Sequence, residues 1–504
     1  MRFRREDLLA GALIALLVAY AAIRAARLPI TIDEAISYRF FVTAPVSEIL
    51  FPDPKSVLQA SGMAANNHVL NSLLAKASSS LFGTSEITLR LPNVFGLAAY
   101  GIFSWLILRS LRSRWISAAG LALMMLNPFL LDYFSMARGY GLSLGLMMPG
   151  LYLLDRGSRV RQPSGRDEFF GLFLIGLGAL ASYVVIDVLL AAAIVLTAVR
   201  AIRIYSQPPA GPFSRLRRLA VESVPLVSIG VLLGASVGLS ALGVQRARGL
   251  WYGGHTGFWR DTVTSLVEPT LYTAPYAAFA RPILTGLIAA AVLFLALRTT
   301  AVLLRRPIAG IAARAAAWTV LLLITAMFGV LEHHLLGLPF RLGRAALFFV
   351  PLFVLAVTAT AASAAVSSKR GRAMAVTGTM VALGIAAGAH FAFCANVNRF
   401  LYFTYDLDTP RLLADLEEKR ASFSHPIRVH TDWKIAPGLE FYRSTRHLWW
   451  ITWDTQANDW SQFDYAYLLP EHSGELAAHG FRFVRSYPLS GNLLGESADV
   501  RHLR

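Results

Sequence analysis

The chain opens with MRFRREDLLAGALIALLVAYAAIRAARLPITIDEAISYRFF (residues 1–41), a basic start, a long apolar run and then a polar turn. An apolar run of about 20 residues crosses the roughly 30 Å hydrocarbon layer of a membrane as a helix. Similar runs recur along the first four-fifths of the chain, which has 504 residues, 55% of them hydrophobic and only 15% charged. This composition predicts a polytopic α-helical membrane protein.

Eleven membrane spans are expected from these apolar runs. The first could also belong to a signal peptide, because it follows basic residues and ends among small ones. We favour a retained span, since the distribution of charge described next requires it. The expected spans are 8–27, 88–108, 115–134, 139–154, 168–183, 187–204, 220–243, 283–304, 315–332, 345–366 and 373–394.

The basic residues indicate how the spans are oriented. Residues 1–398 contain 35 Lys and Arg, and 22 of these lie in the short connections that share a side with the N-terminus. Short basic connections stay on the cytoplasmic side, so the N-terminus is expected inside. The long connections 28–87, 244–282 and 333–344, together with the tail from 399, are then extracytoplasmic. The expected site is therefore extracytoplasmic, at the cytoplasmic (inner) membrane.

The net charge of +17 does not indicate a nucleic-acid partner. Residues 399–504 hold 12 basic and 14 acidic residues, so the excess of positive charge lies entirely in the membrane part. There it is explained by topology. The single cysteine, Cys394, permits no intramolecular disulfide and no cysteine-based metal site.

Two domains are expected, a transmembrane domain at 1–398 with a large outer loop at 28–87, and a small soluble α/β domain at 399–504. In the second, two stretches read as helices, the first with Thr409 as its N-cap, and three read as strands. The expected helices are 409–421 and 471–480, and the expected strands are 427–433, 463–470 and 481–487.

The acidic pair Asp33 and Glu34 is the first candidate for chemistry. Neighbouring residues of a helix do not share a face, so the two carboxylates are expected to point in different directions. A carboxylate at the membrane surface can act as a general base toward a hydroxyl group. The alternative is a solvated pair, or a cap for a helix that starts at Glu34.

Further candidates lie in the other outer segments. His68 begins a stretch, 67–82, that resembles a helix lying in the membrane interface. Arg138 and Tyr140 stand at the boundary between two spans, where Arg suits a phosphate and where a structural snorkelling role is the alternative. The loop after the ninth span is rich in basic residues and suggests an anionic partner; its candidates are Glu332, His333, His334, Arg341 and Arg344.

Four motifs in this order resemble the membrane glycosyltransferases of the GT-C type. They are the Asp33-Glu34 pair, the run NHVLNSLLAKASSSLFGTSEITLRLPNVFG from Asn67, the run ARGYGLSL from Ala137, and LPFRLGRAALFFVPLF from Leu338. The group they resemble most is that of the protein O-mannosyltransferases and lipid A aminoarabinose transferases (glycosyltransferase families 39 and 83). The chain departs from the family pattern at Val69-Leu70, where the family has two prolines after the histidine.

The resemblance implies a GT-C-like fold and an inverting transfer of a sugar from a polyprenyl-phosphate carrier. The acceptor would be a protein, a lipid or a polysaccharide, and membrane lipids would surround the enzyme. Asp33 and Glu34 would be the catalytic carboxylates. A divalent metal ion is a further candidate cofactor, with Glu34, His333 and His334 as its possible ligands. The residues expected to bind substrate are Asn67, His68, Arg138, Tyr140, His255, Arg341 and Arg344.

Two other functions are compatible with the same membrane topology. A flippase or transporter of lipid-linked sugars would be expected to place acidic residues at mid-bilayer depth, and apart from Asp187 the spans hold almost none. A membrane scaffold that binds glycans through its outer domain would give no reason for the acidic pair. The sugar and the acceptor are not determined by these patterns.

Overall fold

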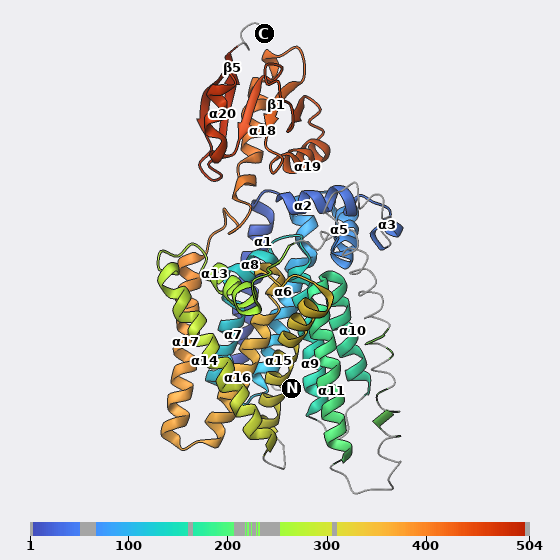
Figure 1. Ribbon diagram of the computed structural model, residues 1–504, viewed down its shortest axis with the longest axis vertical. Helices are drawn as coiled ribbons and strands as arrows, with labels where there is room; N and C mark the ends of the chain where they lie inside the picture. The colour runs from blue at the N-terminus through green and yellow to red at the C-terminus, as the bar shows by residue number, and fades with distance from the viewer. Residues whose placement is uncertain are drawn as a thin grey trace. The chain divides into compact units, whose positions relative to one another are not determined.

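The computed structural model describes residues 4–50, 67–159, 165–205, 252–304 and 310–498, with a few scattered residues between 217 and 231. Most of the described chain is helical, as Figure 1 shows. The chain divides into two compact units, which we describe one at a time. Unit 1 comprises Met1–Ala21, Pro52–Asn71 and Pro92–Ala395, and unit 2 comprises Ala22–Phe51, Ser72–Leu91 and Asn396–Arg504.

Within the described residues, seven helices are long and apolar enough to cross a membrane. An eighth is reached if α7 (Arg114–Met125) and α8 (Pro128–Phe134) count as one span, although they are bent by 62° at their junction. The seven are α1 (Arg5–Arg27), α6 (Glu86–Arg109), η3 (Tyr183–Val185) with α11 (Ile186–Tyr205), α14 (Ala277–Leu304), α15 (Gly310–Leu336), α16 (Phe349–Ser367) and α17 (Arg370–Cys394).

Helices occupy ten of the eleven positions where the sequence predicts spans, which confirms the polytopic helical class. Two of them, α9 (Tyr140–Ser158) and α10 (Gly165–Ala181), do not meet the length and composition required of a span. The span expected at 220–243 lies almost wholly outside the described residues. Within the described residues, seven or eight helices thus meet this test, and the expected total of eleven spans stays a prediction.

Close helix packing in unit 1 depends on glycine. A Cβ atom on Gly145 of α9 would lie 2.5 Å from the Cα atom of Gly96 in α6, so the two backbones touch. Small residues allow such contact, which strengthens dispersion forces where the hydrophobic effect between helices is weak. This contact fixes α9, and with it the polar segment at its N-terminal end.

Shorter elements connect the long helices. The predicted interfacial stretch at 67–82 is indeed helical, because α5 spans Val69–Phe82. The remaining short elements are α2 (Ile32–Ser37), η1 (Tyr38–Val42), α3 (Val46–Leu50), η4 (Trp259–Thr264), α13 (Ser265–Thr270) and η5 (Gly343–Ala346).

The C-terminal residues form the α/β fold that the sequence predicts, with a five-stranded sheet in the order β2-β1-β3-β5-β4 (Figure 1). Strand β1 is parallel to β2 and β3, whereas β5 is antiparallel to β3 and β4. The strands are β1 (Ile427–Thr431), β2 (Ile451–Asp454), β3 (Tyr465–Leu468), β4 (Phe481–Ser486) and β5 (Leu493–Ser497). The helices are η6 (Thr404–Asp406), α18 (Thr409–Lys419), η7 (Arg420–Ser422), α19 (Ala436–Arg446), η8 (Pro470–His472) and α20 (Ser473–Ala478).

The structure differs from the expectation for this region in the cap of α18 and in three additional elements. The N-cap of α18 is Asp408 rather than Thr409, because Thr409 already has helical geometry and Pro410 follows in the first turn. The sequence analysis did not predict helix α19 or strands β2 and β5. One side of the sheet is covered by a core built from Trp460, Phe463, Ala466, Leu468, Leu476 and Phe481.

Candidate active site

In unit 2, the acidic pair lies in a short helix with a reciprocal cap. Thr31 is the N-cap of α2, and its hydroxyl accepts a hydrogen bond from the Glu34 backbone N–H at 3.4 Å. The Glu34 carboxylate in turn accepts the Thr31 N–H at 3.0 Å. This capping box satisfies two backbone donors at the helix start. The N-cap is therefore Thr31, which precedes the acidic pair, and the Glu34 side chain completes the cap, whereas Asp33 takes no part in the capping box.

Arg90, on α6, holds Glu34 in a buried ion pair. Its Nε donates to Glu34 Oε1 at 2.8 Å and its Nη2 to Oε2 at 2.6 Å, and both side chains are fully buried. The other Arg90 donors bond the backbone oxygens of Ala25, Leu28 and Pro29 at 2.6–3.0 Å. A planar guanidinium matches this arrangement because its donors form a fixed fork. Arg90 thus fixes both the end of α1 and the carboxylate of Glu34.

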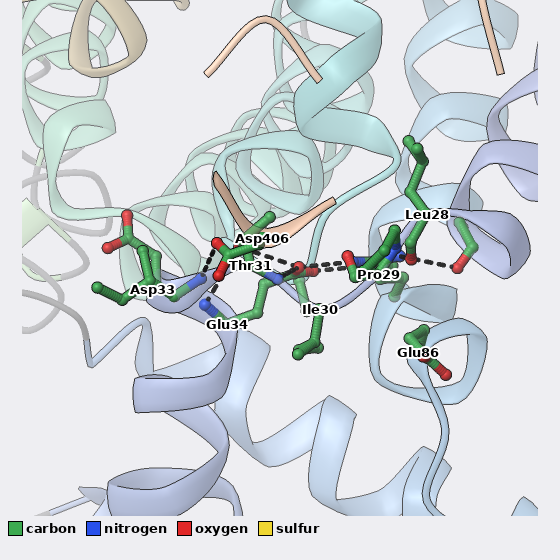
Figure 2. A network of polar contacts seen from close by, with 12 residues as sticks. Leu28, Pro29, Ile30, Thr31, Asp33, Glu34, Glu86 and Asp406 are labelled. Carbon is green, nitrogen blue, oxygen red and sulfur yellow. Dashed lines mark hydrogen bonds and ion pairs between the residues drawn. The ribbon is translucent and has the colours of Figure 1, made fainter. Parts of the chain in front are cut away.

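Asp33 differs from its neighbour in direction and burial. Figure 2 shows its carboxylate pointing away from that of Glu34, as expected for adjacent residues on a helix. Asp33 is only partly buried, whereas Glu34 is 1% exposed. The two carboxylates of the pair therefore differ both in direction and in burial.

A third carboxyl group, Asp406 in η6, joins this turn from 374 residues further along the chain. Its Oδ2 accepts the Ile32 N–H at 2.8 Å, and its side chain is 1% exposed (Figure 2). Burial raises the pKa of Asp406 well above its usual range, and the negative charges of Asp33 and Glu34 raise it further. The bond from Ile32 acts in the opposite direction but does not cancel these effects. Asp406 is therefore expected to hold its proton to a higher pH than an exposed aspartate does.

This assignment predicts how Asp406→Asn changes stability with pH. The folded protein keeps the Asp406 proton to higher pH than the unfolded chain, so wild-type stability falls as pH rises above about 4. Asn cannot lose a proton and can still accept the Ile32 N–H. We expect the variant to gain stability relative to wild type as pH rises from 4 to 8, with a growing difference in thermal midpoint. Asp406→Ala, which loses the hydrogen bond, should be less stable than Asp406→Asn throughout; parallel pH curves for wild type and Asp406→Asn would contradict the assignment.

Tyr442, on α19, completes the support of this turn. Its hydroxyl accepts the Ile30 N–H at 3.0 Å and donates to Glu86 Oε1 at 2.9 Å. Burial raises the pKa of Tyr442 well above its usual range, so it stays protonated and can donate. The turn that carries Asp33 is thus held by Arg90, Asp406 and Tyr442.

In unit 1, His68 is a buried neutral histidine. Its Nδ1 lies 3.0 Å from the carbonyl oxygen of Ala181, and since a carbonyl only accepts, Nδ1 carries the hydrogen. Burial lowers the pKa of His68 well below its usual range, and the charges of Arg138 and Arg344 lower it further. Within the described residues, Nε2 has no hydrogen-bond partner. The ring packs edge-on against Tyr140 with 5.1 Å between centroids.

Arg138 is positioned by two asparagines. The Asn93 side chain donates to Asn71 at 2.7 Å and accepts the Leu142 N–H at 2.9 Å. Asn71 donates to the carbonyl oxygen of Ala137 at 3.2 Å. The two asparagines thus hold the backbone on both sides of Arg138 in the chain. Arg138 itself is 2% exposed. The chain can turn there because the next residue is glycine.

That glycine, Gly139, has a φ of +69° and is the N-cap of α9. A Cβ atom at this position would lie 2.2 Å from the oxygen of Ala181 and 2.8 Å from Cβ of His68. The sequence ARGYG therefore needs glycine here both for the left-handed backbone and for contact with the histidine.

The structure brings four of the predicted substrate-binding residues together in unit 1: His68, Arg138, Tyr140 and Arg344. Arg344 also lies over the ring of Tyr252 at 4.6 Å. Asn67 is buried directly before His68. Two guanidinium groups beside a neutral histidine form an arrangement that suits a phosphate.

Arg341, which the sequence analysis grouped with Arg344, has a different environment. It donates to both oxygens of Asp187 at 3.3 Å and forms an ion pair with Glu332. Burial alone would lower the pKa of Arg341, but the two carboxylates raise it. Its charge is thus compensated within the protein. This geometry accounts for Arg341 without a phosphate.

The histidines proposed as metal ligands do not gather with carboxylates. His333 stacks on Phe340 at 4.0 Å, and its Nδ1 lies 2.8 Å from the Leu338 oxygen. His255 and His334 are ring neighbours of His333, at 6.1 and 5.2 Å. Both oxygens of Glu34 are bound by Arg90, as described above. In the part of the chain that the structure describes, no three His, Cys, Asp or Glu residues are placed to share a metal ion, so we derive no step through a metal.

Several of the residues that hold these clusters were missed by the sequence analysis. Arg90 and Asn93 lie in the quoted motif LRLPNVFG. Arg90 could have been identified from the sequence, because an arginine within an apolar span needs a polar partner. Asp406 and Tyr442 gave no comparable signal, because each looks like an ordinary residue of a soluble domain.

Comparison with known proteins connects these observations to a fold. By sequence, no protein-family model and no curated protein matches the chain. By structure, ArnT from Cupriavidus metallidurans in the apo state matches with a TM-score of 0.51 and 13% identity, over 96% of this chain and 97% of that one. The same protein bound to undecaprenyl phosphate matches with a TM-score of 0.52 and 12% identity, over the same shares of both chains. The chain therefore has the GT-C fold of membrane glycosyltransferases, as the sequence motifs predict.

Proposed function

We propose that this protein is an inverting glycosyltransferase that moves a sugar from a polyprenyl-phosphate carrier to an acceptor. The observation that carries the proposal is the pair Arg138 and Arg344, whose positive charges both act on the buried, neutral His68. A phosphate bound there would gain charge-assisted hydrogen bonds. The GT-C fold supports the same function, and a structural neighbour, ArnT, has been solved with undecaprenyl phosphate.

The proposed reaction is a single displacement at the anomeric carbon of the sugar. An acceptor hydroxyl or amine attacks this carbon, the bond from the carbon to the phosphate oxygen breaks, and polyprenyl phosphate leaves. Asp33 takes the proton of the acceptor as general base. Arg138 and Arg344 stabilise the negative charge on the departing phosphate.

The two acidic residues then have different roles. Asp33 is the catalytic base in this proposal, whereas Glu34 is a positioning residue because Arg90 and Thr31 already occupy its carboxylate. His68 presents Nε2 as an acceptor for a hydroxyl or phosphate hydrogen. Tyr140 supports its ring, and Asn67 and His255 stay candidates for substrate contact.

The location of the reaction is also part of the proposal. The distribution of basic residues supports an active site on the extracytoplasmic face of the cytoplasmic membrane. The acceptor would then be a protein, lipid or polysaccharide on that face. The C-terminal α/β fold, residues 399–504, would lie there as well.

The function is tested with purified full-length protein reconstituted in liposomes with a radiolabelled polyprenyl-phosphate sugar. We expect release of polyprenyl phosphate together with transfer of label to an acceptor from envelope extract. Label that crosses the bilayer with its sugar–phosphate bond intact would indicate a transporter instead. Glycan binding without either event would indicate a scaffold.

Arg344→Gln is expected to raise KM for the carrier by roughly 10- to 100-fold, the equivalent of one charge-assisted hydrogen bond. Arg344→Lys should restore part of this loss, because lysine keeps the charge but not the fork. The matched control is Arg341→Gln in the same loop. Its charge is compensated by Asp187 and Glu332, so it should lower stability while the folded fraction keeps a near-normal KM. Equal effects of both variants on KM would contradict the assignment.

A further inference from the structure

A groove of about 770 Å³ lies in unit 1, and none of the residues assigned above lines it, although Leu342, which does, stands between Arg341 and Arg344 in the chain. One wall comes from η4 and α13, and the other from the first half of α14. Figure 1 shows α13 near the start of α14. The groove thus opens beside a helix whose composition is that of a membrane span.

The α14 wall is made of small residues at helical spacing. Pro282, Thr285, Gly286 and Ala289 line the groove, and positions three, four and seven apart share one helix face. A Cβ atom on Gly286 would meet no other atom within 4 Å, so the groove is open there. Only 11% of the apolar 18-residue stretch of α14 is buried, as expected for a helix that faces lipid. The α14 wall of the groove is therefore continuous with the surface of α14 that is expected to face lipid.

Charged groups gather at one end of the groove. Arg260, Glu268 and Arg281 line it, and Arg281 pairs with Glu268 at 3.4 Å while both stay partly exposed. Asp261 also lines it, but its carboxylate is engaged within its own loop by Thr256 and by the Gly257 N–H. The end of the groove thus presents two guanidinium groups and one carboxylate.

This combination fits a particular class of amphiphile. A headgroup with a phosphate diester and a primary ammonium would place its phosphate against the arginines and its N–H donors against Glu268. From Arg281 to Ala289, α14 rises about 12 Å, which approaches the roughly 15 Å hydrocarbon depth of one leaflet. The groove can hold the upper part of an acyl chain beneath such a headgroup.

We propose that this groove binds one glycerophospholipid with a zwitterionic, primary-amine headgroup of the phosphatidylethanolamine type. The site is independent of the proposed transfer reaction. The groove is connected to Arg344, one of the two arginines proposed to bind the carrier phosphate. Ser265 of the groove wall accepts the Gly343 N–H at 2.8 Å, and Arg344 follows Gly343 in the chain. A bound lipid would stabilise this wall and the loop attached to it.

The test is lipid binding and thermal stability of the purified, delipidated full-length protein. We expect phosphatidylethanolamine to raise the thermal midpoint more than phosphatidylglycerol, which lacks the amine, or phosphatidylcholine, which lacks N–H donors. Ala289→Trp should fill the groove and weaken phosphatidylethanolamine binding, measured by native mass spectrometry, by about tenfold or more. Ala290→Trp is the matched control, because Ala290 is its exposed neighbour on α14 and does not line the groove.

The headgroup assignment has its own variant. Glu268→Gln should keep binding but remove the preference for phosphatidylethanolamine over phosphatidylglycerol. Equal binding by wild type and Ala289→Trp would overturn the site, and a wild-type preference for phosphatidylglycerol would overturn the headgroup. Displacement of phosphatidylethanolamine by undecaprenyl phosphate at equal concentration would show that the groove serves the carrier instead. Both tryptophan variants are checked for folding by size-exclusion chromatography and circular dichroism.

Discussion

Asp33→Asn is expected to reduce turnover by about 10²–10⁴-fold, the usual contribution of a general base. That range corresponds to roughly 3–5 kcal/mol of activation free energy. Asparagine keeps the size of the side chain and its ability to accept a hydrogen bond, but it cannot take the proton. Carrier binding and thermal stability should stay nearly unchanged.

The structure separates this effect from a helix-capping effect. Thr31 caps α2, and Glu34 completes the cap, so Asp33→Asn leaves both capping hydrogen bonds intact. A loss of activity without a loss of stability would therefore report on the reaction itself. Thr31→Ala is the matched structural control, and it should lower stability by about 0.5–2 kcal/mol through loss of the cap.

The measurement is a single-turnover assay on folded Asp33→Asn with saturating carrier, which separates the chemical step from binding and product release. Near-normal transfer by Asp33→Asn would remove the catalytic role and leave Asp33 as a surface feature of this turn.

Arg90→Gln should have the largest effect on stability, a loss of about 3–5 kcal/mol in the free energy of unfolding. The variant leaves the Glu34 carboxylate buried without its cation and leaves three backbone oxygens without their donors. Arg90→Lys should not restore stability, since one ammonium group cannot reach both carboxylate oxygens and these three carbonyls.

Glu34→Gln tests the other half of the ion pair. It should destabilise the protein strongly as well, and the double variant with Arg90→Gln should lose less than the sum of the two single losses, since both remove the same interaction. Arg446→Gln is the control in the same unit. Arg446 is partly exposed and lies 3.6 Å from Glu86, so its loss should cost less than about 1 kcal/mol.

Denaturant unfolding in detergent, followed by circular dichroism, measures these differences. The activity of the fraction of Glu34→Gln that remains folded shows whether Glu34 acts in catalysis or only in positioning. A stable but inactive Glu34→Gln would show that Glu34 acts in catalysis rather than in positioning.

The helical membrane class and the order of the motifs followed from the sequence alone. Bilayer thickness sets the length of a span, and the cost of burying charge keeps it apolar, so each span is visible in about 20 consecutive residues. The same local character made the helix at 67–82 predictable. The acidic pair was recognised for a similar reason, because two adjacent carboxylates stand out beside an apolar run.

Tertiary structure decided which carboxylate is engaged and by what. Arg90 reaches Glu34 across 56 residues, and Asp406 reaches Ile32 across 374. The periodicity of apolar residues along a helix does not predict such pairs, because the pattern around each residue is the same whether or not the contact forms. For the same reason, Arg341 and Arg344 look equivalent in the sequence, whereas in the structure Arg341 forms ion pairs with Asp187 and Glu332.

The sequence therefore determined that this protein crosses a membrane many times, that polar groups collect in the segments between its spans, and that an α/β fold follows. The folded chain decided which of those polar groups are engaged with one another. The physical reason is that burial of an apolar run depends on composition over one span. A buried charge, in contrast, must find its partner at hydrogen-bond distance, and the chain supplies that partner from any distance along its length.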